Sequence, residues 1–135
     1  MTTLELLHKT RSAYINQQKK AEELEEARAA SRRPRSASFD GVKSSTKKDL
    51  SDTMARLEGY AQRSLEASVH FMELDEQLRD RLKARLPWKQ ADVIYYRDVR
   101  GLKWTDLEKR YGRTRQWLSK LRTQGLNELN RRAGY

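Results

Sequence analysis

The chain has no cysteine and only two histidines, His8 and His70, among its 135 residues. Without cysteine it has neither disulfides nor thiolate metal ligands, a composition typical of a reducing compartment. The two histidines are too far apart in sequence to form a motif. A glycine-rich phosphate loop, a nucleophile elbow and a metal-ligand cluster are also missing. The sequence therefore predicts a protein that is not an enzyme and that needs no metal and no cofactor.

Long apolar runs are absent as well. No stretch approaches the roughly 20 apolar residues needed to cross a membrane, and the N-terminus lacks the pattern of a secretion signal. We therefore expect a cytoplasmic protein with no membrane partner. Hydrophobic and charged residues each make up 36% of the chain, and the net charge is +10. This composition is too polar for one large core, and it favours an all-α fold of long, solvated helices with a narrow apolar seam.

Residues 3–30 are predicted to form the first long helix, since an apolar seam recurs there at helical spacing. A break follows at about residues 31–48, a segment with Pro34, Gly41, six basic residues and one acid. This composition predicts a flexible basic linker, which is either a solvated loop or an arm that contacts phosphate when DNA is bound. The expected seam of the first helix is Leu4, Leu7, Tyr14, Ala21 and Leu24, with Ile15 beside it.

A second long helix is predicted over residues 49–86, where Pro87 ends it. Its seam steps alternate between four and three residues, which is a heptad repeat and predicts a helical hairpin or coiled coil. Pairing within one chain and pairing across a homodimer through residues 1–86 both remain open. The seam consists of Leu50, Met54, Leu57, Ala61, Ser64, Ser68, Phe71, Asp75, Leu78 and Leu82.

The segment 87–135 carries the pattern of a helix-turn-helix domain. Thr105 and Glu108 are spaced as a capping box, which predicts that a short helix begins at about Asp106. Gly112 then supplies the positive φ of a sharp turn, and Thr114 caps the next helix. A supporting helix over 88–99, closed by Gly101, is expected to precede this pair. We expect the segment to fold as a domain of its own, without residues 1–48.

The second helix of the pair presents a polar, basic face. Residues 87–135 contain twelve Lys or Arg and five Asp or Glu, a local net charge of +7, which is typical of a DNA-binding module. Arg115 and Gln116 are placed to reach base edges, because Arg pairs with guanine and Gln with adenine. The predicted sites for double-stranded DNA are Thr114, Arg115, Gln116, Ser119, Lys120 and Thr123, with Lys109, Arg110, Arg113 and Arg122 at phosphates.

A family resemblance rests on the same segment. The residues that carry it are Val93–Arg97, Gly101–Trp104, Leu107, Tyr111–Gly112, Leu118 and Leu126–Leu129. They resemble region 4 of the sigma-70 family and, more closely, phage-encoded regulators of late transcription of the ArpU/RinA type. The resemblance implies a phage or prophage transcriptional regulator of late genes in the bacterial host cell, with RNA polymerase as a candidate partner. Departures from the family pattern are Glu108, Arg113 and Gly125, the last of which is expected to mark the end of its helix.

Two other functions fit the same pattern. A coiled-coil scaffold or adaptor protein would bind a protein partner through its long helices, and its basic surface would be incidental. A phage small terminase subunit also combines a helix-turn-helix with oligomeric helices. Its motif usually stands at the N-terminal end, however, whereas here it is C-terminal.

Overall fold

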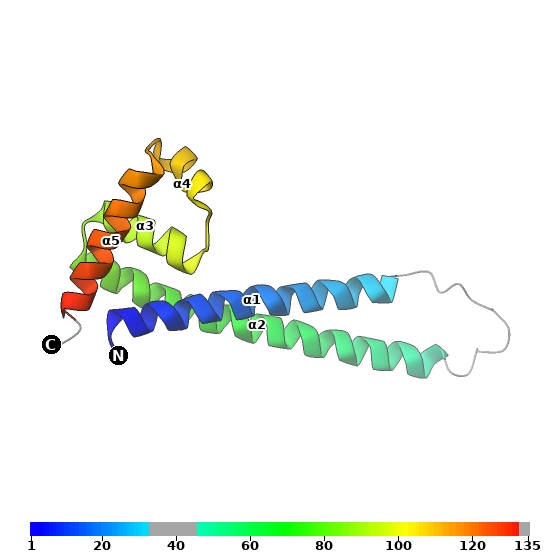
Figure 1. Ribbon diagram of the computed structural model, residues 1–135. Coiled ribbons are helices and arrows are strands. Elements are labelled where there is room, and N and C mark those ends of the chain that lie inside the picture. Colours follow the sequence, from blue (N-terminus) through cyan, green and yellow to red (C-terminus); the bar gives the residue numbers. More distant parts are fainter. Residues whose placement is uncertain (33–45, 133–135) are drawn as a thin grey trace. The chain divides into compact units, whose positions relative to one another are not determined.

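The structure is a computed structural model that describes residues 1–32 and 46–132 (Figure 1). Within these residues the chain is helical and contains no strand, which confirms the predicted all-α class. Residues 33–45, the middle of the predicted linker, lie outside the described residues, whereas its two ends are helical. The elements are α1 (Thr3–Arg32), α2 (Thr46–Arg85), α3 (Trp88–Ile94), the π-helical turn η1 (Tyr95–Val99), α4 (Trp104–Tyr111) and α5 (Arg115–Arg132).

The chain divides into two compact units, and both long helices contribute to each. The first unit comprises Met1–Ile15 and His70–Tyr135, and the second comprises Asn16–Val69. The first therefore contains the start of α1, the end of α2 and all of the C-terminal helices. The predicted domains, 1–86 and 87–135, stay a prediction.

In the first unit, α1 and α2 pair as an antiparallel hairpin within one chain. Arg81 Nη1 donates to the Met1 carbonyl at 2.6 Å, and Arg85 Nη1 donates to Thr3 Oγ1 at 2.9 Å. Further along, the Tyr14 and Phe71 rings lie 5.4 Å apart. Residue numbers thus rise on α1 as they fall on α2, as a hairpin requires. The sequence left open whether the long helices pair within one chain or across a homodimer. In the first unit, they pair within the chain.

The main core lies where this hairpin meets α3, η1 and α5. Its members come from every helix of the first unit except α4, so the start of α1 is as much a part of this core as α5 is. The buried residues are Leu6, Leu7, Ala13, Phe71, Leu78, Leu82, Leu86, Ala91, Ile94, Tyr95, Val99 and Leu129.

The predicted seam of α1 was only partly right. The structure buries Leu6, Leu7, Thr10 and Ala13, whereas Ile15 is 50% exposed. Both α2 and η1 pack against α1 in this region, so the buried face is broader than the narrow stripe that a simple hairpin needs. Thr10 is tolerated there because its hydroxyl donates to the Leu6 carbonyl at 2.7 Å.

Asp75, a polar member of the predicted α2 seam, has a specific partner in η1. The Tyr95 hydroxyl donates to Asp75 Oδ1 at 2.6 Å and accepts from Arg79 Nη2 at 2.8 Å and from Arg100 Nε at 3.0 Å. Arg79 also pairs with Asp75 at 3.1 Å. Burial is the main cause that raises the pKa of Tyr95 above its usual value. This cluster joins α2 to the C-terminal helices.

The second unit has almost no core of its own. Ala67 is the only buried hydrophobic residue among the described residues of this unit, and Leu57 of the predicted seam is only half-buried. Leu50 and Met54 are 56% and 61% exposed. Among the described residues, the seam is therefore only partly covered here.

The C-terminal helices build a second, smaller core around Val93, Leu107 and Leu118. Gly101 (φ 68°) ends the predicted helix over 88–99, which is confirmed, although its last turn is π-helical. Figure 1 shows α5 crossing α3, with α4 joined to the start of α5 by a short turn. In that turn Gly112 has a φ of 62°, as predicted.

Two predicted helix caps can be compared with the structure here. Thr114 caps α5 as predicted, since its Oγ1 accepts the Trp117 N–H at 3.3 Å. The Thr105 capping box was wrong. Instead, α4 begins at Trp104, and the Lys103 carbonyl accepts the Leu107 N–H at 3.1 Å. Trp104 packs against the second core, so the helix begins two residues before the predicted Asp106.

Gly125 does not end its helix, because α5 continues to Arg132. A Cβ at this position would lie only 2.5 Å from Ile94 Cδ1. The glycine therefore serves the close approach of α5 to α3, which offsets its low helix propensity of about 1 kcal/mol relative to alanine.

Candidate nucleic-acid interface

One face of α5 gathers half of the predicted DNA-binding residues around a shallow groove. We call it the α5 face. None of the ten predicted residues is buried, and only Ser119 and Arg122 are half-buried. Gln124 was not predicted, although its spacing of one turn from Lys120 could have revealed it. The groove is lined by Arg115, Gln116, Ser119, Lys120, Thr123 and Gln124.

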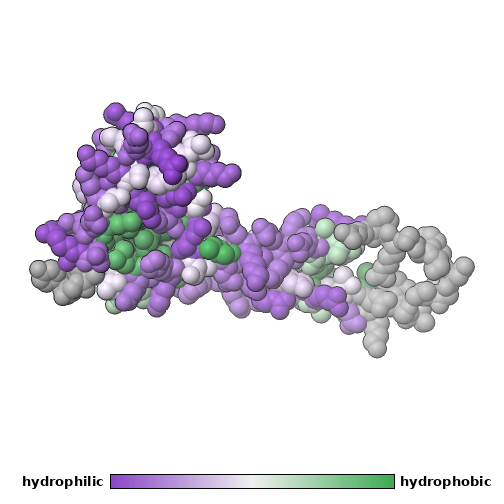
Figure 2. Space-filling model, viewed as in Figure 1, coloured by the Kyte–Doolittle hydropathy of each residue, from purple (hydrophilic) through white to green (hydrophobic). Residues whose placement is uncertain are grey.

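The α5 face carries positive charge and hydrogen-bonding groups but no carboxylate. Glu128 is the only acid of α5, and its Oε1 accepts from Arg131 Nη2 at 2.8 Å. Figure 2 shows that the visible surface over α4 and α5 is mainly hydrophilic. The amide of Gln116 and the hydroxyl of Thr123 can donate and accept, whereas Lys120 can only donate. The face therefore suits a ligand that is anionic and rich in acceptors.

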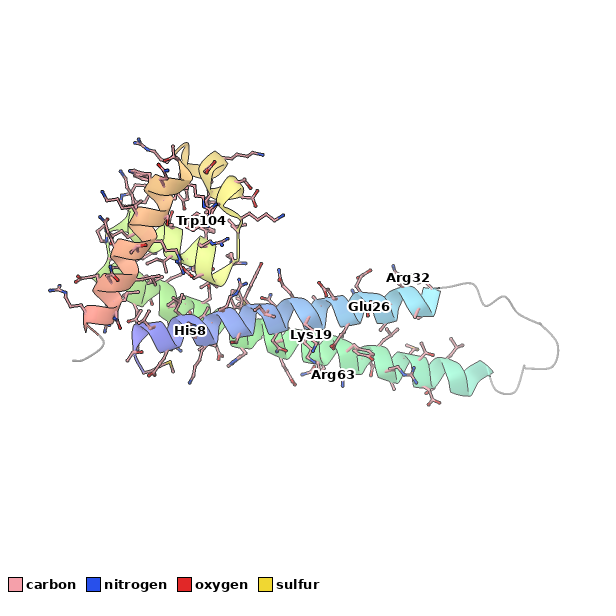
Figure 3. All side chains as sticks on the ribbon, in the orientation of Figure 1. His8, Lys19, Glu26, Arg32, Arg63 and Trp104 are labelled. Carbon is pink, nitrogen blue, oxygen red and sulfur yellow. The ribbon has the colours of Figure 1, made fainter. Side chains whose placement is uncertain are left out.

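Arg115 leans toward the start of α4 rather than straight out from α5. Its Cζ lies 5.8 Å from the centre of the Trp104 ring, and Arg97 lies over the same ring at 4.8 Å. Trp104, labelled in Figure 3, is half-buried, so its ring is a fixed surface on which the guanidinium can rest. Gln116 and Lys120 are exposed and have no such neighbour.

Arg122, predicted to contact phosphate, has a partner within the chain. Its Nε and Nη2 donate to the two carboxylate oxygens of Asp98 at 2.9 and 2.7 Å. These hydrogen bonds are the main cause that raises the pKa of Arg122. The paired geometry fixes α5 against η1. Arg122 is therefore placed to orient the α5 face, since Asp98 already neutralises its charge.

The other flanking cations are spread around the two short helices. Arg110 lies over the Tyr96 ring at 4.0 Å, and Arg113 lies over the Trp117 ring at 5.0 Å. Lys109 is exposed on α4. The structure thus does not bring these three side chains onto the α5 face, but it leaves each of their charges at the surface.

Tyr111 ties the end of α4 to α3. Its hydroxyl donates to Asp92 Oδ2 at 3.2 Å. Burial, together with the negative charge of Asp92, raises the pKa of Tyr111 to about 12. The protonated phenol of Tyr111 therefore helps to hold α4 against α3.

We expect Tyr111 to titrate later than an ordinary tyrosine when the protein is made alkaline. The pKa of Tyr111 is higher in the folded state than the usual value of about 10. Protonation of Tyr111 therefore contributes its full stabilisation of the fold below about pH 10. This contribution is lost as the pH rises through about 12. Phenolate absorbance in the ultraviolet would measure the titration, and Tyr111→Phe should remove one late transition. The same late transitions in the variant would contradict this assignment.

Within the described ranges, no group of three or more His, Asp or Glu residues is arranged to hold a metal ion. In the same ranges, no helix is both long enough and apolar enough to span a membrane. Comparison of the chain with family models, curated proteins and solved structures gave no match. The case for a function therefore rests on the geometry of α4, α5 and the residues around them.

Proposed function

We propose that the chain binds double-stranded DNA sequence-specifically through α5 and regulates transcription. The observation that carries this proposal is the α5 face, a carboxylate-free groove with the side chains that read base edges. An α-helix fits the major groove of DNA, and α5 presents its exposed residues within the segment 87–135, whose local net charge is +7. The resemblance to the ArpU/RinA type narrows the proposal to late genes of a phage or prophage.

The arrangement of α4 and α5 supports a helix-turn-helix. The two helices are joined by a turn whose glycine has a positive φ, and they share the core around Leu107 and Leu118. In this motif the second helix enters the major groove while the first crosses the backbone. α5 is then the recognition helix, and Lys109 and Arg110 of α4 lie where phosphates would pass.

Each side chain of the interface takes a role from its surroundings. Gln116 and Lys120 read base edges, because they are exposed and line the groove of the α5 face. Arg115 reads the adjacent base from its place on Trp104. Lys109, Arg110 and Arg113 contact phosphates, and Arg122 orients α5 through Asp98 instead of binding DNA.

Selection of bound duplexes from a random pool tests these roles. Gln116→Ala should lose preference at one base position, and Lys120→Ala at a neighbouring one, each by about 1–3 kcal/mol. Gln77→Ala and Lys83→Ala are the matched controls, since both positions are exposed on α2. Recovery of the unchanged motif with both α5 variants would show that α5 does not read the bases.

A salt titration separates this proposal from the scaffold alternative. Three cations, Lys109, Arg110 and Arg113, are assigned to phosphates, so log K should fall against log salt with a slope of about −3. The scaffold reading predicts no duplex binding at low salt. Arg110→Ala should weaken binding similarly on all sequences and make the slope shallower by about one.

A protein partner for the second unit is a further part of the proposal. Leu50 and Met54 are more than half exposed, and Leu57 of the same seam is only half-buried. Apolar side chains along a long helix gain by burial against another helix. A homodimer through this unit would present two copies of α5 to the DNA, one for each of two half-sites. If the chain does not bind duplex DNA, the exposed apolar residues of the second unit favour the alternative function of a coiled-coil scaffold or adaptor protein. RNA polymerase is the other partner that the resemblance implies.

A further inference from the structure

A small pocket in the first unit shares no residue with the α5 face. We call it the tryptophan pocket, because Trp88 and Trp117 both border it. Residues of α3, α4, α5 and the turn between the last two contribute to it. It is lined by Trp88, Lys89, Val93, Tyr111, Arg113, Trp117 and Leu121.

The pocket is too small for a cofactor and has an apolar lining. Its volume is about 160 Å³, whereas pockets for drug-sized ligands span about 300–1,000 Å³. Val93 is buried, and Leu121 and Trp117 are half-buried. These dimensions and surfaces suit one inserted aliphatic or aromatic side chain.

Trp88 is unusually exposed for a residue beside such a pocket. Its side chain is 66% exposed, the largest value among the exposed large hydrophobics of the described residues. Exposed tryptophan is costly in water, but it is enriched at the centres of protein–protein interfaces. A bound side chain would cover the Trp88 ring and the open side of Trp117 together.

The two charged residues of the lining are both cations. Lys89 Nζ lies 5.8 Å from the Trp88 ring centre and 5.9 Å from that of Trp117. Arg113 approaches Trp117 from the turn, at 5.0 Å. No carboxylate lines the pocket, and the neighbouring Asp92 accepts the Tyr111 hydroxyl. The rim therefore attracts negative charge to both sides of the apolar opening.

We propose that the tryptophan pocket binds an acidic segment of a protein partner. One apolar side chain of that segment enters between Trp88 and Trp117, and flanking carboxylates meet Lys89 and Arg113. The small volume and the buried Val93 in the lining favour a single side chain over a nucleic-acid base, which needs a flat, open stacking surface. The pocket shares no residue with the α5 face, so the segment leaves the base-reading side chains free, although Arg113 then contacts either a phosphate or a carboxylate of the segment.

A nitrogen-15 NMR titration of the full-length protein, without DNA, tests the proposal. The probe is a capped peptide, Asp-Asp-Leu-Asp-Asp, and the control peptide carries Ser in place of Leu. The chain has three tryptophans, so three indole N–H signals report on binding. The Leu peptide should shift the signals of Trp88 and Trp117 in a saturable manner and leave that of Trp104 unchanged. The Ser peptide should bind at least about tenfold more weakly.

Two variants connect the shifts to the pocket. Trp88→Ala should weaken binding about tenfold or more, and the exposure of Trp88 means that the fold survives the change. Lys89→Glu should weaken it roughly fivefold, whereas Lys83→Glu, an exposed control on α2, should have no effect. Equal binding of both peptides, or unchanged binding by Trp88→Ala, would overturn the proposal. So would a duplex DNA that shifts the Trp88 and Trp117 signals while the Leu peptide does not.

Discussion

A chain that begins at residue 16 should fail to fold its C-terminal helices. The deletion removes Leu6 and Leu7 from the main core, and both are almost fully buried. It also removes Arg11, whose Nη1 donates to the Val99 carbonyl at 2.9 Å. Truncation of one buried leucine to alanine costs about 2–5 kcal/mol. Loss of both therefore approaches the whole stability of a typical domain, about 5–15 kcal/mol.

Circular dichroism and NMR signal dispersion would measure this effect. Leu6→Ala gives a milder version, with an expected loss of about 2–5 kcal/mol in the free energy of unfolding. Ile15→Ala is the matched control on the same helix, because Ile15 is half exposed and should change stability by about 0.5 kcal/mol or less. A cooperative thermal transition of the 16–135 fragment close to that of the full chain would disprove the integral role of α1.

The expectation that residues 87–135 fold alone came from reading the chain as consecutive segments. Leu6 and Val99 are far apart in sequence, yet they share one core. Periodicity shows that a helix has an apolar face but does not show which later helix will cover it. The sequence therefore predicted two long helices that pair, but it did not predict that the start of α1 shares a core with α3, η1 and α5 as well.

Local chemistry was read more reliably than tertiary partners. Gly101, Gly112 and the Thr114 cap depend only on nearby backbone geometry, and all three were predicted. The Thr105 cap failed because packing of Trp104 in the second core moved the helix start. Gly125 was interpreted as a helix end because local sequence does not reveal its close contact with Ile94. That contact joins residues 31 positions apart. Tertiary packing overrides a local signal at both positions.

At the candidate site, too, local features were predicted from the sequence and tertiary contacts were not. Helical spacing was enough to predict that Arg115, Gln116, Ser119, Lys120 and Thr123 would share one face of α5. The pairing of Arg122 with Asp98 spans 24 residues and two helices. No spacing rule indicates such a pair, so Arg122 was assigned to phosphate. Composition predicts that a surface is basic, whereas only the fold shows which cations are already neutralised.

Leu78→Asp should prevent folding of the first unit rather than only dissociate a dimer. Leu78 is fully buried in the main core, where its neighbours are apolar. A carboxylate at that position would have to remain unpaired in the core or become protonated, and either outcome costs several kcal/mol. We therefore expect loss of the cooperative thermal transition and of dispersed NMR signals. A heptad seam taken alone predicts only a change of oligomeric state.

Leu57→Asp is the matched comparison. It makes the same substitution in α2, but in the part of that helix that belongs to the second unit. Leu57 is half-buried and lies outside the main core. The first unit should then remain folded and bind duplex DNA through α5. If the second unit mediates a homodimer, sedimentation should change from a dimer to a monomer in this variant. A Leu78→Asp protein that stays folded while dissociating would instead place Leu78 between two chains. A Leu57→Asp protein that unfolds completely would show that the two units cannot be separated energetically.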